Sequence, residues 1–361
     1  PILDRRRTAF HCNGQCKQAR LWISSIPGGE TEGAPPRHFV ECVASYLGTA
    51  SPCVRQLVGL PIYDQNGGAR GFVNQYGDEL ASLQLVGDGW RRHHDKAKDS
   101  ICDEQLGLGI AASTEVWGIF SPLIPAGQRR APLDAPGWEA KRLRHGLVPD
   151  LAMELPPDLG GDATAPPRKQ LGEVKTIHHC PTHDVASNNN PGIFGAAVKR
   201  RAEKIAREYK DKARRLDTEF GLTPDGADGP CLSRLLTFGA IAAFVFGAAG
   251  EVSRDFDRWV ASVAAVSAAR MSRLIGARTT DQARGCIAWR LRRKVGWVAI
   301  NAAASLKIDR CEFVGPGGAQ AAKRRAAASR DSRQARNHSW QNAARVDRDE
   351  RRARQRFRPW G

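Results

Sequence analysis

The sequence has no hydrophobic run long enough to cross a membrane. Its longest stretch without a charged residue covers residues 235–250 and contains three glycines. A membrane-spanning helix needs about 20 mostly apolar residues. A signal-peptide pattern is also missing, because Arg5, Arg6 and Arg7 interrupt the first apolar residues. We therefore expect neither a membrane-spanning protein nor a secreted one.

Cysteine pairs at regular spacing are missing as well. The nine cysteines are scattered along the chain, and an odd, dispersed set without a signal peptide indicates reduced thiols inside a cell. We expect an intracellular protein, nuclear if the source is a eukaryote. Two clusters contain zinc-binding residue types, but neither has a second ligand pair at a useful spacing, so zinc is not expected. These clusters are His11, Cys12 and Cys16, and His178, His179, Cys180 and His183.

Acidic residues are too few to balance the basic ones. The 55 lysines and arginines against 38 aspartates and glutamates give a net charge of +17. This charge favours a polyanionic partner such as DNA or RNA, or an acidic membrane surface. Residues 319–361 supply +9 of it, from 13 basic and four acidic residues. Because this segment is rich in Ala and Arg, we expect residues 318–361 to be a disordered basic tail.

Hydrophobic spacing indicates an α/β protein. The order of elements is typical of one small mixed β-sheet flanked by helices, with extra helices towards the C-terminus. Helices are expected over residues 38–47, 90–106, 197–216, 252–273, 282–294 and 298–308. Strands are expected over residues 57–62, 111–120, 147–155, 170–177 and 235–246.

These elements divide the chain into five expected segments. A core domain follows a partly helical N-terminal segment and a glycine-rich region, and precedes a helical extension and the basic tail. The expected boundaries, in that chain order, are 1–50, 51–90, 91–275, 276–317 and 318–361.

The chain is organised around residues 147–177, where two apolar strand-like runs bracket a loop rich in Gly, Asp and Pro. Side chains alternate across a strand, so Glu173 and Lys175 point to one face and Val174 to the other. If the two runs pair side by side, Asp150 joins Glu173 and Lys175 at one place. Two carboxylates and an amine suit a hard divalent cation with a positioned water or phosphate. A surface hairpin with ordinary charged residues is the alternative.

The clearest helix, residues 197–216, has one apolar face and one basic face. The basic side chains form either an ordinary solvated surface or a surface that follows nucleic-acid phosphates. The expected helix over residues 282–294 is basic too. The candidate nucleic-acid-binding residues on these helices are Lys199, Arg200, Lys204, Arg207, Arg292 and Arg293.

With these motifs in this order, the chain resembles the PD-(D/E)xK, or restriction-endonuclease-like, nuclease superfamily. The resemblance implies a restriction-endonuclease-like core with a metal site on adjacent strands. Asp150 matches the first acidic ligand, Glu173 the second, and Lys175 the lysine of the Glu-x-Lys motif. The 22 residues between Asp150 and Glu173 fall within the superfamily's loose range.

A closer resemblance extends upstream, to the restriction-like endonuclease at the C-terminus of some non-LTR retrotransposon proteins. Those proteins carry a cysteine/histidine knuckle, then an Arg-His-Asn/Asp segment, then the Pro-Asp. Here His93, His94 and Asp95 stand in the place of that segment, and residues 51–90 in the place of the knuckle. The knuckle departs from the pattern, because Cys53 is its one remaining cysteine. This departure also argues against zinc.

The resemblance implies a metal-dependent DNA endonuclease that nicks or cuts target DNA for a mobile element. Asp150 and Glu173 would hold Mg²⁺ or Mn²⁺, and Lys175 would orient the attacking water or stabilise charge in the transition state. Nicking by one site and double-strand cutting by a homodimer both fit. Accessory candidates for metal, phosphate or proton contacts are Glu115, Glu104, Asp162, His93 and His94.

Two other functions stay open. One is a catalytically inactive remnant of such an endonuclease, which would bind nucleic acid through the basic helix and tail. This hypothesis shares the basic charge with the endonuclease hypothesis, and the two differ only in whether the carboxylates act in catalysis. An RNA- or protein-interaction scaffold would use residues 276–310. For the accessory residues the alternatives are solvent-facing carboxylates at Glu104 and Glu115, and histidines that cap or pack a helix start.

Overall fold

The structure is a computed structural model. It describes residues 6, 9–10, 21–22, 35–87, 89–116, 119–123, 147–155, 166–178, 196–223, 228–247 and 250–331. Several residues singled out in the sequence lie outside these ranges: His11, Cys12, Cys16, Asp162, His179, Cys180, His183 and the last 30 residues, 332–361.

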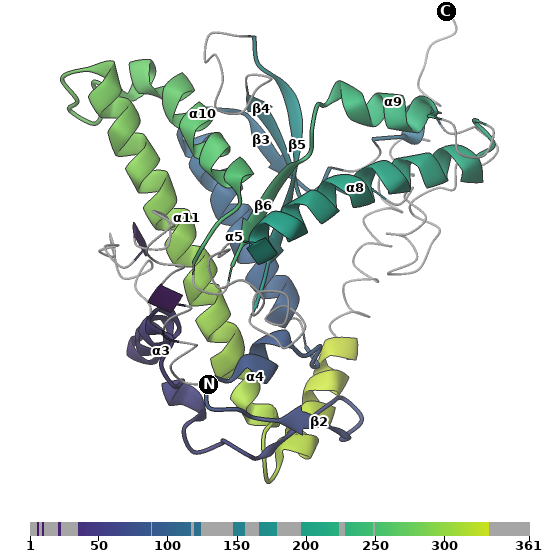
Figure 1. The fold of residues 1–361 in the computed structure, drawn as a ribbon, viewed down its shortest axis with the longest axis vertical. Helices are drawn as coiled ribbons and strands as arrows, with labels where there is room; N and C mark the ends of the chain where they lie inside the picture. The colour runs from purple at the N-terminus through teal and green to yellow at the C-terminus, as the bar shows by residue number, and fades with distance from the viewer. Residues whose placement is uncertain are drawn as a thin grey trace, which may run out of the picture.

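Among the described residues, the strands form one four-stranded and one two-stranded sheet. The larger sheet has the order β3 (Ala112–Thr114), β4 (Leu151–Leu155), β5 (Arg168–Thr176), β6 (Ala242–Phe246). β4 is antiparallel to both its neighbours, whereas β5 and β6 are parallel. The molecule is therefore a mixed α/β protein, as the sequence predicts, with helices on either side of the sheet (Figure 1).

The two faces of this sheet carry different helices because successive strand residues point to opposite sides. One face packs against α5 (Gly89–Gly107), α10 (Arg254–Met271) and α11 (Thr280–Arg310). Its strand residues include Leu151, Met153, Val174 and Phe244. The other face packs against α8 (Ala196–Glu219) and α9 (Pro230–Thr237). Its strand residues are Ala152, Leu171, Ala243 and Val245.

A glycine in β5 lets the aromatic core approach the sheet closely. A Cβ atom at Gly172 would lie 2.9 Å from the Phe244 ring and 3.2 Å from the Met153 methyl group. Any larger residue would therefore push the core away from β5. Gly172 precedes Glu173, so this packing also fixes the backbone that carries the candidate site.

α11 is one continuous helix of 31 residues, whereas the sequence pattern predicts two shorter helices over residues 282–294 and 298–308. Gly296 lies between them, and a glycine inside a helix costs about 1 kcal/mol relative to alanine. Packing offsets this cost, because Gly296 is buried and its neighbours Val295 and Ala299 belong to the core over the sheet.

A smaller hydrophobic cluster surrounds the C-terminal end of α11. It includes residues of β1 (Pro61–Tyr63), α4 (Asp78–Ser82) and η5 (Cys311–Phe313), and Val73, which follows β2 (Ala69–Phe72). α3 (Pro36–Leu47) packs beside this cluster on α11. Lys307 donates to the Glu41 carboxylate at 3.1 Å, and Arg310 donates to the Leu80 carbonyl at 2.7 Å. Lys307 is thus paired with a carboxylate, as burial of a charge requires. Arg310 donates from Nη1 to backbone carbonyls, while its Nε and Nη2 have no hydrogen-bond partner among the described residues.

Three other sequence predictions need correction. The strand expected over residues 235–246 begins only at Ala242, because residues 230–237 form α9. A continuous apolar run does not distinguish a buried strand from a buried helix. The strand expected over residues 111–120 is reduced to β3. Residues 318–331 of the expected disordered tail are helical, and Ala322 of this helix is buried in the smaller cluster.

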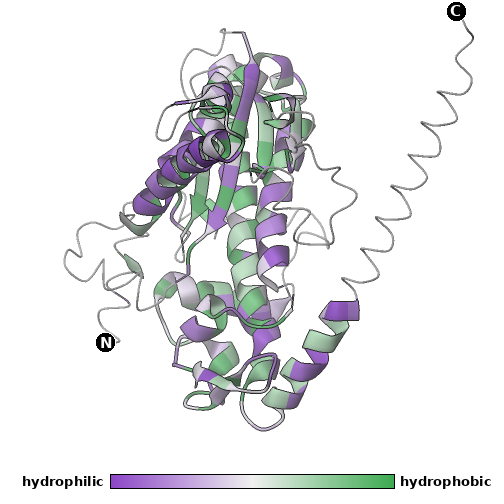
Figure 2. Cartoon of the chain, turned by 90° about the vertical axis from the view of Figure 1, so that its right-hand side faces the viewer, coloured by the Kyte–Doolittle hydropathy of each residue, from purple (hydrophilic) through white to green (hydrophobic). Residues whose placement is uncertain are grey.

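Hydropathy follows the layers of the fold. Figure 2 shows hydrophobic residues along the central strands and hydrophilic residues along the outer sides of the helices. Among the helices of the described ranges, none is both long and apolar enough to span a bilayer.

Candidate active site

Strand pairing places Asp150 beside the second half of β5. Asp150 immediately precedes β4, and the register sets Leu151 opposite Gly172. The backbone N–H of Val174 donates to Asp150 Oδ2 at 2.8 Å. The two runs, residues 147–155 and 170–177, are therefore neighbours, which is the condition under which the charged residues converge.

Glu173 and Lys175 point away from the core that buries Val174. Lys175 Nζ lies 2.5 Å from Glu173 Oε1 and 3.9 Å from Asp150 Oδ2. Both carboxylates are mostly buried, with side chains 13% and 14% exposed. The structure thus brings the three residues together where β5 passes the start of β4, on the two inner strands of the sheet. Their catalytic role stays a prediction.

A fourth side chain, Tyr209 of α8, completes this group. Its hydroxyl donates to Glu173 Oε2 at 2.5 Å. Burial and the charge of Glu173 raise the pKa of Tyr209, so the hydroxyl keeps its proton and acts as donor. The sequence did not indicate Tyr209 as a site residue, because Tyr209 falls on the apolar face of the helix expected over residues 197–216. The one indication of a special role is its hydroxyl group, since the other buried residues of that face are apolar.

α5 supplies a histidine to this group. His94 Nε2 lies 3.0 Å from Asp150 Oδ2, and His94 Nδ1 lies 3.3 Å from Asp95 Oδ1. Lys98 continues the network, donating to Asp95 at 3.1 Å and to Glu115 at 3.3 Å. Glu115 is therefore linked to the Asp150 carboxylate through Lys98, Asp95 and His94.

The backbone at Glu115 is unusual. Its φ of 52° makes it the one non-glycine residue with positive φ in the described part of the chain. Left-handed backbone is costly for such a residue and clusters at functional sites. Glu115 also donates its backbone N–H to the Asp150 carbonyl at 2.9 Å, so the strained residue holds the segment that carries Asp150.

The two carboxyl groups have pKa values that are pushed apart. Burial by itself raises the pKa of Asp150, but the hydrogen bond and charge of His94 and the charge of Lys175 hold it below its ordinary value. Burial and the charge of Asp150 raise the pKa of Glu173, although Lys175 and Tyr209 oppose this. Burial lowers the pKa of His94, but Asp150 outweighs it and the net direction is upward. Such opposed environments are typical of functional sites.

Two accessory candidates lie elsewhere. Glu104, whose side chain is 5% exposed, forms ion pairs with Lys294 at 2.7 Å and Arg290 at 3.3 Å. Glu104 therefore pairs with basic residues of α11 and not with the group around Asp150 and Glu173 as an extra metal ligand. His93 is buried, with its ring 5.1 Å from the His178 ring. The side chain of His93 thus packs against another ring inside the protein and offers no exposed surface to a phosphate.

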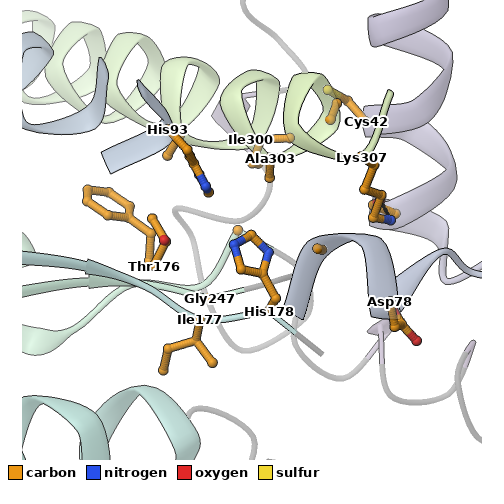
Figure 3. A pocket seen from close by; sticks show the side chains of 17 residues that line it. Cys42, Asp78, His93, Thr176, Ile177, His178, Gly247, Ile300, Ala303 and Lys307 are labelled. Atoms are coloured by element: carbon orange, nitrogen blue, oxygen red, sulfur yellow. Dashed lines mark hydrogen bonds between the residues drawn. The ribbon is translucent and has the colours of Figure 1, made fainter. Parts of the chain in front are cut away.

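His93 and His178 face a separate cavity of about 40 Å³. Figure 3 shows both rings directed into it, below the part of α11 that carries Ile300 and Lys307. The cavity lies between α11, the helices α3 and α4 and the ends of β5 and β6, and His93 is its one residue from α5. Neither Asp150 nor Glu173 lines it, so it is separate from the candidate active site.

The candidate nucleic-acid residues divide between the two faces of the sheet. On α8 they are exposed: Lys199, Arg200, Lys204 and Arg207. α8 and α9 lie in the chain between the parallel strands β5 and β6, and Tyr209, near the middle of α8, contacts Glu173 of β5. On the opposite face, Arg292 pairs with Asp257 at 3.2 Å and Arg293 lies over the Trp289 ring at 4.3 Å.

The donor set of the site suits Mg²⁺ or Mn²⁺. Among the described residues, no group of three or more His, Cys, Asp or Glu side chains is arranged to hold one ion. Mg²⁺ typically uses one or two carboxylates and fills its other positions with water and substrate. Asp150 and Glu173, two mostly buried carboxylates that share Lys175, fit that requirement.

No protein-family model matches the chain, and no curated protein or solved structure matches it either. Its function therefore has to be argued from the arrangement of its own residues.

Proposed function

We propose that the protein is a metal-dependent DNA endonuclease with a restriction-endonuclease-like core. The observation that carries this proposal is the convergence of Asp150, Glu173 and Lys175 on paired strands, with Lys175 Nζ within 3.9 Å of both carboxylates. An accidental motif would have no reason to sit on neighbouring strands. The buried, hydrogen-bonded setting of both carboxylates further favours a built site over a surface hairpin.

In this proposal Asp150 and Glu173 hold Mg²⁺ or Mn²⁺. When bound, the ion polarises the scissile phosphate and lowers the pKa of a water molecule. Lys175 orients the attacking water and stabilises negative charge on the phosphate with its ammonium group. His94 fixes Asp150 through its hydrogen bond at 3.0 Å. Lys98 and Asp95 in turn fix His94.

The basic side chains of α8 bind the substrate backbone. Lys199, Arg200 and Lys204 are exposed in the half of α8 that precedes Tyr209, the residue that contacts Glu173. Phosphate contacts position DNA without reading its sequence, so this surface predicts salt-dependent binding with little sequence preference. Target cleavage for a mobile element, inside the cell, is the biological role that we propose. A homodimer is the form that would cut both strands.

The test is nicking of supercoiled plasmid in Mg²⁺ or Mn²⁺. We expect Glu173→Ala and Lys175→Ala each to lower the nicking rate at least about 100-fold, the scale of a group that stabilises transition-state charge. Glu154→Ala is the matched control, because Glu154 is an exposed carboxylate on β4. Absence of nicking by the parent, or equal nicking by all variants, would contradict the proposal.

The basic surface also favours a second function, nucleic-acid binding without cleavage. The exposed α8 residues and the net charge of +17 do not depend on the carboxylates. This function predicts that the parent, Glu173→Ala and Lys175→Ala bind DNA equally and that none of them nicks it.

A further inference from the structure

Tyr209 is the feature that the resemblance leaves unexplained. It lies in the buried stripe of α8, whose other members, Val198, Ile205, Ala213 and Leu216, are apolar. Packing alone would be served by phenylalanine, which has no hydroxyl to satisfy. A buried hydroxyl needs a partner, and the partner of Tyr209 is Glu173 Oε2 at 2.5 Å.

The two oxygens of Glu173 consequently have different surroundings. Oε1 lies 2.5 Å from Lys175 Nζ, which is also 3.9 Å from Asp150 Oδ2. Oε1 thus shares a cationic partner with Asp150. Oε2 is held from α8 by Tyr209. A divalent cation in the place of the Lys175 ammonium group would therefore meet Oε1, while Oε2 stays bonded to Tyr209.

We infer that Tyr209 is a positioning residue that restricts Glu173 to one-oxygen binding and thereby selects Mg²⁺ or Mn²⁺ over Ca²⁺. The inference rests on the proposed function, since it assumes that Asp150 and Glu173 hold a divalent cation. Mg²⁺ demands a compact octahedral shell, whereas Ca²⁺ takes six to eight ligands and readily accepts a bidentate carboxylate. Hydrogen bonds that orient ligating carboxylates typically contribute 10–100-fold to metal affinity.

The test measures metal binding directly, without DNA. Mn²⁺ affinity is determined from the electron paramagnetic resonance signal of free Mn²⁺, and Ca²⁺ affinity from competition with Mn²⁺. Tyr209→Phe keeps the ring and removes the hydroxyl, and Glu173 retains Lys175, so we expect the variant to fold with a similar melting temperature. Tyr63→Phe is the control, because Tyr63 lies on β1 and packs in the smaller cluster.

We expect Tyr209→Phe to weaken Mn²⁺ binding about tenfold or more and to lower the Mn²⁺/Ca²⁺ affinity ratio by a similar factor. Tyr63→Phe should change neither. In a Glu173→Gln background, Tyr209→Phe should have no further effect on the ratio, because the oxygen that it orients has been replaced. A purely structural role would instead give the same loss in both backgrounds.

An unchanged ratio in Tyr209→Phe overturns the inference, as does an equal loss in the Glu173→Gln background. If the parent binds Mn²⁺ but never nicks DNA, the proposed nuclease function fails while the role of Tyr209 is still decided by the ratio. If the parent binds no Mn²⁺, both fail.

Discussion

At the scale of single residues, alternation along one strand decides most of the candidate site. Glu173 and Lys175 share a face because they are two residues apart, and Val174 enters the core for the same reason. That relation is readable from the sequence. The contacts of His94 and Tyr209 cannot be predicted in this way. His94 lies 56 residues before Asp150 in the chain, and Tyr209 lies 36 residues after Glu173.

His93 gives a prediction about pH and stability. Burial lowers the pKa of His93 from 6.5 to about 4, although a hydrogen bond to the backbone of Ala299 opposes it. The unfolded chain therefore takes up a proton near pH 6.5 and the folded protein does not. The resulting stability is complete above pH 6.5 and is lost as the pH falls towards 4, by about 3 kcal/mol in total.

Urea unfolding of the parent and of His93→Gln at pH 7.5 and pH 4.5 measures this contribution. The free energy of unfolding should fall by about 2–3 kcal/mol more in the parent than in the variant between these pH values. The same fall in both proteins would mean that His93 is not responsible.

At the scale of elements, α8 has two faces of different character. Its apolar stripe covers one side of the sheet, and its exposed basic residues face solvent. The helix and its stripe are predictable from spacing alone, since the sequence predicts residues 197–216 and the structure has Ala196–Glu219. The contact of Tyr209 with Glu173 is a tertiary contact between α8 and β5, which the sequence does not specify.

We expect neutralisation of the start of α8 to weaken DNA binding more than neutralisation of its end. The test variant is Lys199→Ala/Arg200→Ala. The control is Arg214→Ala/Arg215→Ala, which removes the same charge from exposed positions further along the helix. Each lost phosphate contact lowers the slope of log affinity against log salt by about 0.9.

Titration of a DNA duplex at several salt concentrations distinguishes the two ends. The test variant should lose up to about two phosphate contacts, which lowers its slope by up to about 1.8. The control should keep the slope of the parent. Equal losses would mean that binding depends on net charge and not on the position of the helix start.

At the scale of the whole molecule, the small cluster around the end of α11 is part of one continuous structure. α11 packs under the sheet through Leu291 and Val295 and ends beside Phe313 in the smaller cluster. Residues 318–331 add a helix to that cluster through Ala322. The last described residue is therefore the natural boundary for testing the basic C-terminal segment.

Removal of residues 332–361 should weaken DNA binding and flatten its salt dependence without changing the melting temperature. This segment carries nine arginines against three acidic residues, and charge of this kind contributes mainly through counterion release. Removal from residue 319 is the comparison, and it should also lower the melting temperature, because it deletes buried Ala322. An unchanged salt slope in the shorter truncation would contradict the role of this segment.

The sequence by itself determined the α/β class, the basic character, the amphipathic helix over residues 197–216 and the shared face of Glu173 and Lys175. All of these depend on local periodicity or on composition, which need no knowledge of distant contacts. The tertiary structure decided that Asp150 meets that face, that His94 and Tyr209 hold the two carboxylates, and that Glu104 and His93 do not join them. It also decided that residues 280–310 form one helix. These outcomes depend on strand register and on packing between distant segments, which a linear pattern does not encode.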